Sequence, residues 1–307
     1  MRAEPLALAP AMTADTALQE IGRACLAHLS RNEPAALAGQ PEAVHQMRVA
    51  LRRLRSALLA FKKMLPKADR RWVVDDIEAL DAALGRARNL DVFAHELVAP
   101  CRAELSGEAD FPALEEALAR RRQEAYRTVE TRLLSPAHKS AMARLERWFE
   151  GRGWRRPELT AADATPLRDA AVRLLDRRRR DVKRRSKGFR RLSAKKRHKL
   201  RIAVKELRYT LELLAGLYAK DALAGFEKRL KRLQDDLGYA NDVRVGHSLV
   251  AELGIDGASA SSVAAAGALV LAWHERRLEA GERRLRKHLR RLDEAKPVWR
   301  ASAAQPG

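Results

Sequence analysis

An eleven-residue segment occurs twice in the chain, and this internal repeat constrains the fold more than any other feature of the sequence. Residues 45–55 read His-Gln-Met-Arg-Val-Ala-Leu-Arg-Arg-Leu-Arg, and residues 198–208 read His-Lys-Leu-Arg-Ile-Ala-Val-Lys-Glu-Leu-Arg, an offset of 153 (198 − 45). Five of the eleven positions are identical and four more are conservative changes. The pairs Leu84-Gly85 and Leu237-Gly238 have the same offset of 153. The sequence therefore predicts two related structural units.

Composition and periodicity predict that both units are helical. Aromatic residues make up only 5% of the 307 residues, whereas the strong helix formers Ala, Leu and Arg dominate. Apolar residues three and four apart, with turn residues between the runs, predict helices over 13–30, 42–65, 69–84, 89–105, 112–133 and 137–149. The expected fold class is all-α, with two pseudo-symmetric repeats of antiparallel helical bundles.

Proline, glycine and asparagine residues indicate where the helices are expected to begin and end. We expect Pro34 and the two residues before it to end the first helix, and Pro66 to end the second. Gly85 is expected to close the third helix and Asn89 to cap the fourth, with Gly238 closing a helix in the second unit.

A turn-rich stretch divides the chain into its expected domains. Residues 151–165 contain two glycines and Pro157 and are followed by Pro166, which makes them the predicted linker. The first helical repeat is expected over 13–150 and the second over 166–295. Short tails are expected at 1–12 and 296–307.

The charge balance indicates a polyanionic partner. The chain has 61 Lys and Arg against 40 Asp and Glu, a net charge of +21. Two cysteines are too few for a disulfide scaffold or a cysteine-rich zinc site. We see no signal-like or membrane-spanning apolar run, and so expect a cytoplasmic protein with no membrane partner.

The repeated segment places a stripe of cations on one helix face. If each residue turns about 100° and His45 is at zero, then Arg48, Arg52 and Arg55 lie at roughly 300°, 340° and 280°, and Lys63 returns to about 0°. The apolar arc lies beside this stripe. His198, Arg201, Lys205 and Arg208 reproduce the geometry in the second repeat.

Two interpretations of the stripe compete. Long cationic side chains often cover the flank of a bundle, but a solvated flank normally mixes charges at helical spacing. This stripe holds almost no acids, so like charges repel unless an anion compensates them. Arg suits phosphate because its guanidinium forms paired hydrogen bonds to phosphate oxygens.

These motifs resemble those of the CHAD family, the conserved-histidine α-helical domain. The resemblance rests on the two repeated segments and on Leu-Gly-x-x-Arg-Asn-Leu-Asp-Val (84–92), with its second copy from Leu237, and extends over about residues 13–295. It implies non-catalytic binding of inorganic polyphosphate between the two bundles and association with polyphosphate granules. Some CHAD domains are accompanied by a catalytic CYTH domain, which we do not expect in this sequence because no Glu-x-Glu-x-Lys motif occurs in it.

Transferred by motif, the resemblance implies binding positions in both repeats. They are His45, Arg48, Arg52, Arg55, His198, Arg201, Lys205, Arg208 and Tyr209. Glu206 replaces Arg53 of the first copy but lies off the stripe, whereas Glu212 lies on the second stripe and is expected to shorten it.

The densest basic run covers residues 177–197. We favour the interpretation that this run is a second group of phosphate contacts, which continues into the stripe that begins at His198. Lys195 and Lys196 are the lysines of the run that lie nearest to His198 in the sequence. The alternatives are a solvated helix face and a nonspecific nucleic-acid patch.

Two other functions, nucleic-acid binding and metal-dependent catalysis, each have some support in the sequence. A nucleic-acid-binding protein is the main alternative, and the net charge alone predicts weak nonspecific binding, but few aromatic residues are available for base stacking. A helical-bundle metal enzyme is suggested by Glu42-x-x-His45, but Lys195 stands where the second copy would need the carboxylate. No cofactor, metal or catalytic residue is expected.

Overall fold

The computed structural model describes residues 1–4, 6–155, 166–254 and 260–300, and within them all the named elements are helices. The first half contains α1 (Ala14–Leu37), α2 (Pro41–Ala60), α3 (Lys67–Val92), the π-helix η1 (Phe93–Val98), α4 (Ala99–Leu105), α5 (Phe111–Leu134) and α6 (Pro136–Glu150). The second half contains α8 (Leu167–Ser186), α9 (Ala194–Leu213), α10 (Lys220–Leu253) and α11 (Ala260–Glu294), with single 3₁₀ turns at Phe189–Arg191, Ala215–Leu217 and Val298–Arg300. The predicted all-α class is confirmed.

Helix starts repeat along the chain with the offset of the sequence repeat. Helices α1 and α8 begin at residues 14 and 167, α2 and α9 at 41 and 194, and α3 and α10 at 67 and 220. Each pair is therefore 153 residues apart. The pseudo-two-fold relation between the halves stays a prediction, as do the domain limits, since most of the expected linker 151–165 and of the tail 296–307 lies outside the described residues.

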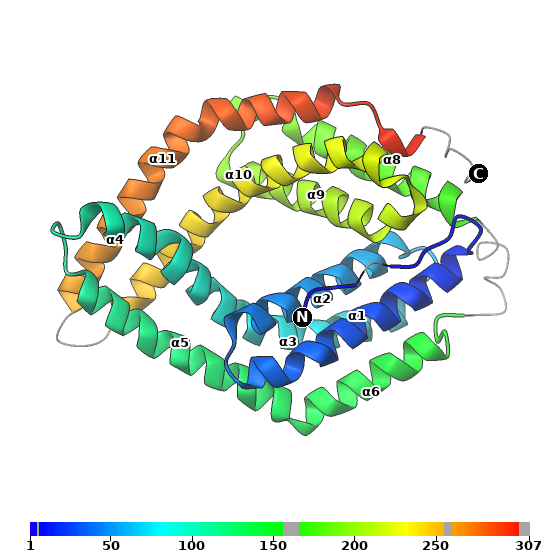
Figure 1. The fold of residues 1–307 in the computed structure, drawn as a ribbon, viewed down its shortest axis with the longest axis horizontal. Coiled ribbons are helices and arrows are strands. Elements are labelled where there is room, and N and C mark those ends of the chain that lie inside the picture. Colours follow the sequence, from blue (N-terminus) through cyan, green and yellow to red (C-terminus); the bar gives the residue numbers. More distant parts are fainter. Residues whose placement is uncertain (5, 156–165, 255–259, 301–307) are drawn as a thin grey trace.

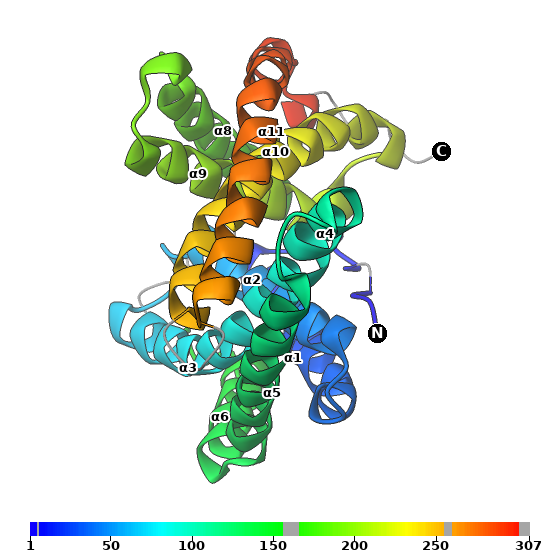
Figure 2. The same ribbon diagram turned by 90° about the vertical axis from the view of Figure 1, so that its left-hand side faces the viewer.

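The two halves pack on one continuous core. In Figure 1 the helices α1, α2, α3, α5 and α6 form the lower half and α8 to α11 the upper half. The long helices α10 and α11 reach down to pack on α3, α4 and α5, as the side view of Figure 2 also shows. Helix α9 packs on α2 in the middle of the molecule.

The other end of the molecule is tied by the N-terminal segment. The Leu167 amide donates to the Met12 carbonyl at 2.8 Å, and Thr13 forms an isolated bridge with Pro166. The Leu6 carbonyl lies so close to Gly216 that a β-carbon there would meet it at 3.0 Å. The two halves are thus joined at both ends.

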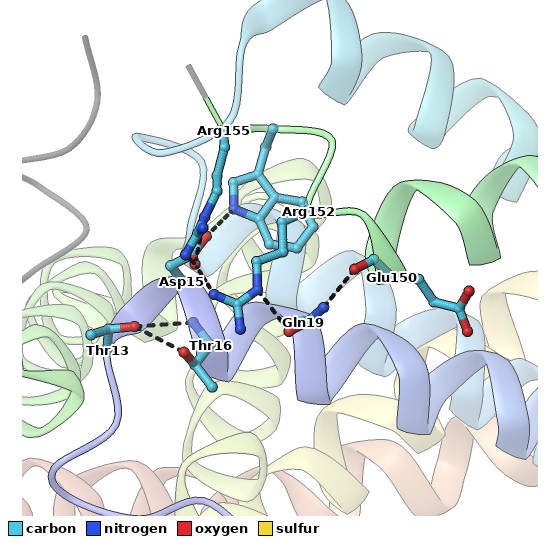
Figure 3. Close-up of polar contacts among 8 residues, drawn as sticks. Thr13, Asp15, Thr16, Gln19, Glu150, Arg152 and Arg155 are labelled. Atoms are coloured by element: carbon cyan, nitrogen blue, oxygen red, sulfur yellow. Dashed lines mark hydrogen bonds and ion pairs between the residues drawn. The ribbon is translucent and has the colours of Figure 1, made fainter. Parts of the chain in front are cut away.

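Each half is closed by a Trp-Arg pair that returns to its first helix. In the first half, Trp154 donates its indole N–H to buried Asp15 at 2.6 Å, and Arg152 and Arg155 donate to the same carboxylate. Figure 3 shows this cluster at the start of α1, next to the Thr13 side chain that caps the helix. In the second half, Trp299 and Arg300 donate to Asp176 on α8, at 3.0 Å and 2.7 Å.

The predicted helix ends at Pro34 and Pro66 are wrong. Helix α1 continues through Pro34 to Leu37, because a proline in the last turn removes a single hydrogen bond while Ala36 beyond it stays buried. Gly39, with φ at 72°, makes the actual turn. Helix α2 stops at Ala60, before Pro66, as the chain turns to bury Phe61 and Met64.

The predicted break at Gly85 and Asn89 is also wrong. Helix α3 runs through both residues to Val92, and α10 likewise runs through Gly238. The irregularity lies further on, in η1, just before Pro100. Proline has no N–H and clashes with the carbonyl four residues earlier, so the helix widens there. Within η1, the Leu97 carbonyl accepts from His274 Nε2 on α11 at 2.8 Å.

Candidate functional site: a basic seam between α2 and α9

The stripe helices α2 and α9 meet through their cationic faces. The Arg52 guanidinium carbon lies 4.4 Å from the centre of the Tyr209 ring. Lys205, one turn before Tyr209 on α9, lies within electrostatic reach of Arg48 and Arg52 on α2 and of Arg201 on its own helix. We call Arg48, Arg52, Arg201, Lys205 and Tyr209 the basic seam.

Crowding of like charges in the seam perturbs its ionisable groups. The pKa of Lys205 falls from 10.5 to about 8, first because the ammonium is partly buried and then because Arg201, Arg52 and Arg48 repel its charge. Burial also lowers the pKa of Arg48 and Arg201, partly offset by Asp81 and Asp242. The seam is therefore a place where a bound anion relieves electrostatic strain.

Two guanidinium groups of the seam have unused donors. The Nε atoms of Arg52 and Arg201 are buried and have no hydrogen-bond partner. Within the described part of the chain, no carboxylate forms an ion pair with Arg52, Arg201 or Lys205. Because the Nε atoms are buried, a ligand oxygen would have to meet the other donors of these partly exposed, unpaired side chains.

Other members of the stripes are already paired. Arg48 and Arg55 donate to Asp81 on α3, at 2.9 Å and 2.5 Å. Arg208 donates to Glu212 at 2.7 Å, so this acid does neutralise the end of the second stripe. The two stripes thus differ in how much charge they leave free.

The two repeat histidines are held mostly neutral. Burial lowers the pKa of His45, and the neighbouring Arg88 lowers it further, while Glu42 opposes the shift. Exposed His198 also has a lowered pKa, from desolvation and then from Arg201 and Arg244. Both rings are thus placed beside cations that an anion would screen.

Arg88 and Arg244 are site residues that the sequence analysis missed. Arg88 lies on α3 beside His45, and Arg244 lies on α10 beside His198 and Arg201. Arg88 stands in the repeated Leu-Gly motif, so its position was a usable signal. Arg244 has no such signal, because the first repeat has Asp91 in its place.

Three expected contacts are exposed lysines that do not belong to the five residues of the seam. Lys63 is exposed in the turn after Ala60, so the helical angle that placed it on the stripe does not apply. Lys195 and Lys196 are exposed in the first turn of α9. Their part in binding stays a prediction.

The basic run on α8 lines a separate concavity of about 620 Å³. Its walls are Arg177, Arg178, Arg180, Asp181, Lys183, Arg184 and Lys187. Part of the charge is used internally, since Arg178 pairs with Glu206 at 2.7 Å and Lys183 with Asp293 at 3.1 Å. Glu206 therefore ties α8 to α9.

Several histidines outside the stripes form contacts within the fold. His138 pairs with Glu33 at 2.5 Å, and His288 with Asp236 at 2.6 Å. Glu42 accepts from Gln46 at 2.7 Å. In the described ranges, no three His, Cys, Asp or Glu side chains gather as metal ligands would, and no helix combines the length and hydropathy needed to span a bilayer.

The fold and the site together define a class of protein: an all-α protein in which two cationic helices face each other near the centre. A sequence profile of the CHAD domain matches residues 20–251. The crystal structure of the CHAD domain from the plant Ricinus communis superposes with a TM-score of 0.77 at 30% identity, covering 94% of this chain and 96% of that one. The chain belongs to the CHAD family.

A more distant structure shares the fold. PptA from Streptomyces chartreusis superposes with a TM-score of 0.68 at 17% identity, covering 91% of this chain and 99% of that one. A search of curated proteins returns no match.

Proposed function

We propose that the protein binds inorganic polyphosphate along the basic seam without altering it chemically. The observation that carries the proposal is the contact between Arg52 and Tyr209, because it brings the stripes of α2 and α9 within reach of a single polymer chain. CHAD family membership supports the same ligand. The residues proposed as direct contacts are Arg52, Arg201 and Lys205, flanked by Arg48, Arg88, Arg244 and the two repeat histidines.

The chemistry of the seam suits a linear phosphate polymer. Each bridging phosphate carries a negative charge and two free oxygens, which match the paired donors of a guanidinium. Displacement of condensed counterions adds to the affinity and makes it fall with salt. With its pKa at about 8, Lys205 is mostly protonated at neutral pH, and a bound polyanion would stabilise that charge.

The alternative partner, nucleic acid, fits the seam less well. Stacking of bases requires an open aromatic face. Tyr209 is only 5% exposed and Arg52 covers its ring. Base stacking at the seam is therefore blocked, and nucleic acid is left with charge attraction alone.

A competition experiment tests the ligand. Labelled long-chain polyphosphate is bound at physiological salt, and duplex DNA, RNA and heparin are titrated against it at equal anionic charge. We expect polyphosphate to be retained. Displacement by DNA at an equal phosphate concentration would contradict the proposal, and shortening of the bound polymer on a gel would contradict its non-catalytic part.

A pair of charge-reversal variants tests the site. Arg52→Glu with Arg201→Glu should abolish retention while circular dichroism stays unchanged. The matched control is Arg127→Glu with Arg232→Glu, which changes the net charge equally at two exposed positions on α5 and α10. If both double variants lose affinity to the same extent, overall charge rather than the seam holds the polymer.

Association with polyphosphate granules in the cytoplasm follows from the same proposal. A fluorescent fusion of the chain should colocalise with a polyphosphate stain, and the seam double variant should not. Diffuse fluorescence of the unmodified fusion in granule-containing cells would contradict it.

A further inference from the structure

One carboxylate holds two arginines of the first stripe. Asp81 Oδ1 accepts from Arg48 Nη1 at 2.9 Å, and Oδ2 accepts from Arg55 Nη1 at 2.5 Å. The main-chain carbonyl of Asp81 accepts from the same Arg48 nitrogen at 3.0 Å. Asp81 is only partly exposed, with 21% of its side chain accessible.

Among the described residues, no carboxylate accepts from two arginines of the second stripe, although Asp242 acts on Arg201 and Lys205 through its charge. Gln234 occupies the corresponding place, 153 residues after Asp81 and fifteenth in α10 as Asp81 is fifteenth in α3. Its Oε1 is buried without a partner, as is Nε of Arg201, the counterpart of Arg48. Arg208, the counterpart of Arg55, pairs with Glu212 on its own helix instead.

A carboxylate that accepts from two guanidinium groups offers them what a phosphate offers, namely two anionic oxygens a short distance apart. We propose that Asp81 is an internal competitor for the phosphate polymer, which occupies the anion position of Arg48 and Arg55 in the free protein. This inference rests on the proposed function. The polymer then binds directly at the second stripe, where Gln234 leaves the cations free, and must displace Asp81 to engage the first.

The opposite role for Asp81 makes a contrary prediction. A carboxylate that only positions Arg48 and Arg55 would aid binding, so its removal would weaken affinity. A competitor opposes binding, so its removal strengthens affinity. The sign of the change therefore separates the two roles.

The experiment compares Asp81→Asn with Asp76→Asn. Asp76 lies on the same helix and pairs with Arg144 at 2.5 Å, so both variants gain one unit of positive charge by removing a carboxylate that pairs with arginine, two arginines at Asp81 and one at Asp76. With long-chain polyphosphate as the probe, Asp81→Asn should bind about tenfold more tightly than Asp76→Asn, and with a steeper salt dependence because two more cations exchange counterions.

The reciprocal variant installs the competitor in the second half. Gln234→Glu should weaken polyphosphate binding several-fold, while the control Gln123→Glu, at an exposed position on α5, should not. If Asp81→Asn fails to fold, this pair alone decides the question.

The outcomes separate the two proposals. Failure of the unmodified protein to bind polyphosphate overturns both the proposed function and this inference. Binding by the unmodified protein, with Asp81→Asn no tighter than Asp76→Asn or Gln234→Glu no weaker than Gln123→Glu, overturns only the inference.

Discussion

Arg48 lies against the backbone of Gly85, and a β-carbon at position 85 would stand 2.5 Å from Arg48 Nη1. The glycine therefore makes room for a guanidinium and does not end a helix. It costs helix α3 stability, since glycine in a helix interior is about 1 kcal/mol worse than alanine. The equivalent Gly238 has nothing within 4 Å of its ideal β-carbon.

Replacing Gly85 by alanine should therefore weaken polyphosphate binding without unfolding the protein. The added methyl group would stand where the Arg48 guanidinium lies, so that cation would leave its place in the seam, and we expect this loss to outweigh its release from Asp81. Gly238→Ala is the matched control, and it should gain up to about 1 kcal/mol in unfolding free energy with unchanged affinity. Titration with polyphosphate and urea unfolding measure the two effects. Equal affinities for both variants would show that the position of Arg48 is unimportant.

Tyr209 should act as the platform on which Arg52 rests. Tyr209→Leu removes the ring and with it a cation–π contact worth about 0.5–1 kcal/mol, so the affinity for polyphosphate should fall two- to fivefold. Tyr209→Phe keeps the ring and should bind like the unmodified protein. A loss in the phenylalanine variant would instead point to the hydroxyl group.

Lys205 should make binding depend on pH above neutrality. Its pKa in the free protein is about 8, against an ordinary 10.5, because of burial and because Arg201, Arg52 and Arg48 face it, with only Asp242 opposing them. Lys205 therefore loses its proton as pH rises through about 8, while a bound polyanion pulls the pKa back up. Affinity should fall between about pH 8 and 10, and calorimetry in buffers of different ionisation enthalpy should show proton uptake on binding.

Lys205→Arg provides the control for this effect. Arginine keeps its charge across the whole range, so the fall in affinity above pH 8 should flatten and proton uptake should disappear. An unchanged pH profile in this variant would assign the titration to another group.

The Asp15 cluster should stabilise the fold in a pH-dependent way. Burial acts to raise the pKa of Asp15, but hydrogen bonds from Arg155 and Trp154 outweigh it and hold the pKa below 3.8. The folded state therefore favours the ionised form, so this contribution is complete above about pH 4 and is lost as pH falls through the folded-state pKa. Asp15→Asn should lower the unfolding free energy by about 2 kcal/mol at pH 7.

The same substitution should leave the polyphosphate affinity intact, because Asp15 lies at the start of α1 and outside the seam. The difference in stability between Asp15→Asn and the unmodified protein should shrink as urea unfolding is repeated below pH 4. A difference that stays constant down to pH 2 would contradict the role of the ionised carboxylate.

The salt dependence of polyphosphate affinity should report how many cations of the seam contact the polymer. For a single-stranded polyanion, each neutralised charge adds about 0.7 to the slope of log affinity against log salt. Arg52→Gln and Arg201→Gln should each reduce that slope by about this amount, whereas Arg232→Gln on the exposed face of α10 should not. Equal slopes for all three variants would show that the polymer contacts other groups.

Sequence patterns predicted the helices better than their ends. The helices expected at 112–133 and 137–149 lie within one residue of α5 and α6 at each end, because Asp110 and Ser135 cap them as local chemistry dictates. The ends at Pro34, Pro66 and Gly85 were wrong because tertiary packing overruled local preference: Ala36 and Phe61 are buried, and Gly85 receives Arg48.

The stripes were predictable from periodicity, but their neutralisation was not. Helical spacing places Arg48, Arg52 and Arg55 on one face whatever surrounds them. Which of them meets a carboxylate depends on Asp81, a residue 26 positions after Arg55 that only the packing of α3 on α2 brings close. The Trp-Arg closures were overlooked although the dipeptide occurs at 154–155 and again at 299–300.

The contacts that join the two halves at both ends of the molecule bear on how the seam would bind a polymer. Helices α10 and α11 pack on α3 and α5 at one side, and the N-terminal segment is bonded to Leu167 at the other, so the described residues hold the two halves together on both sides of the seam. The binding site is then expected to change little in shape when the flexible polymer binds. Most of the conformational entropy lost on binding is therefore that of the polymer. A polymer that is already stiff, for instance because divalent cations are bound to it, would therefore lose less conformational entropy on binding. It would also carry less net negative charge, so its attraction to the seam would be weaker.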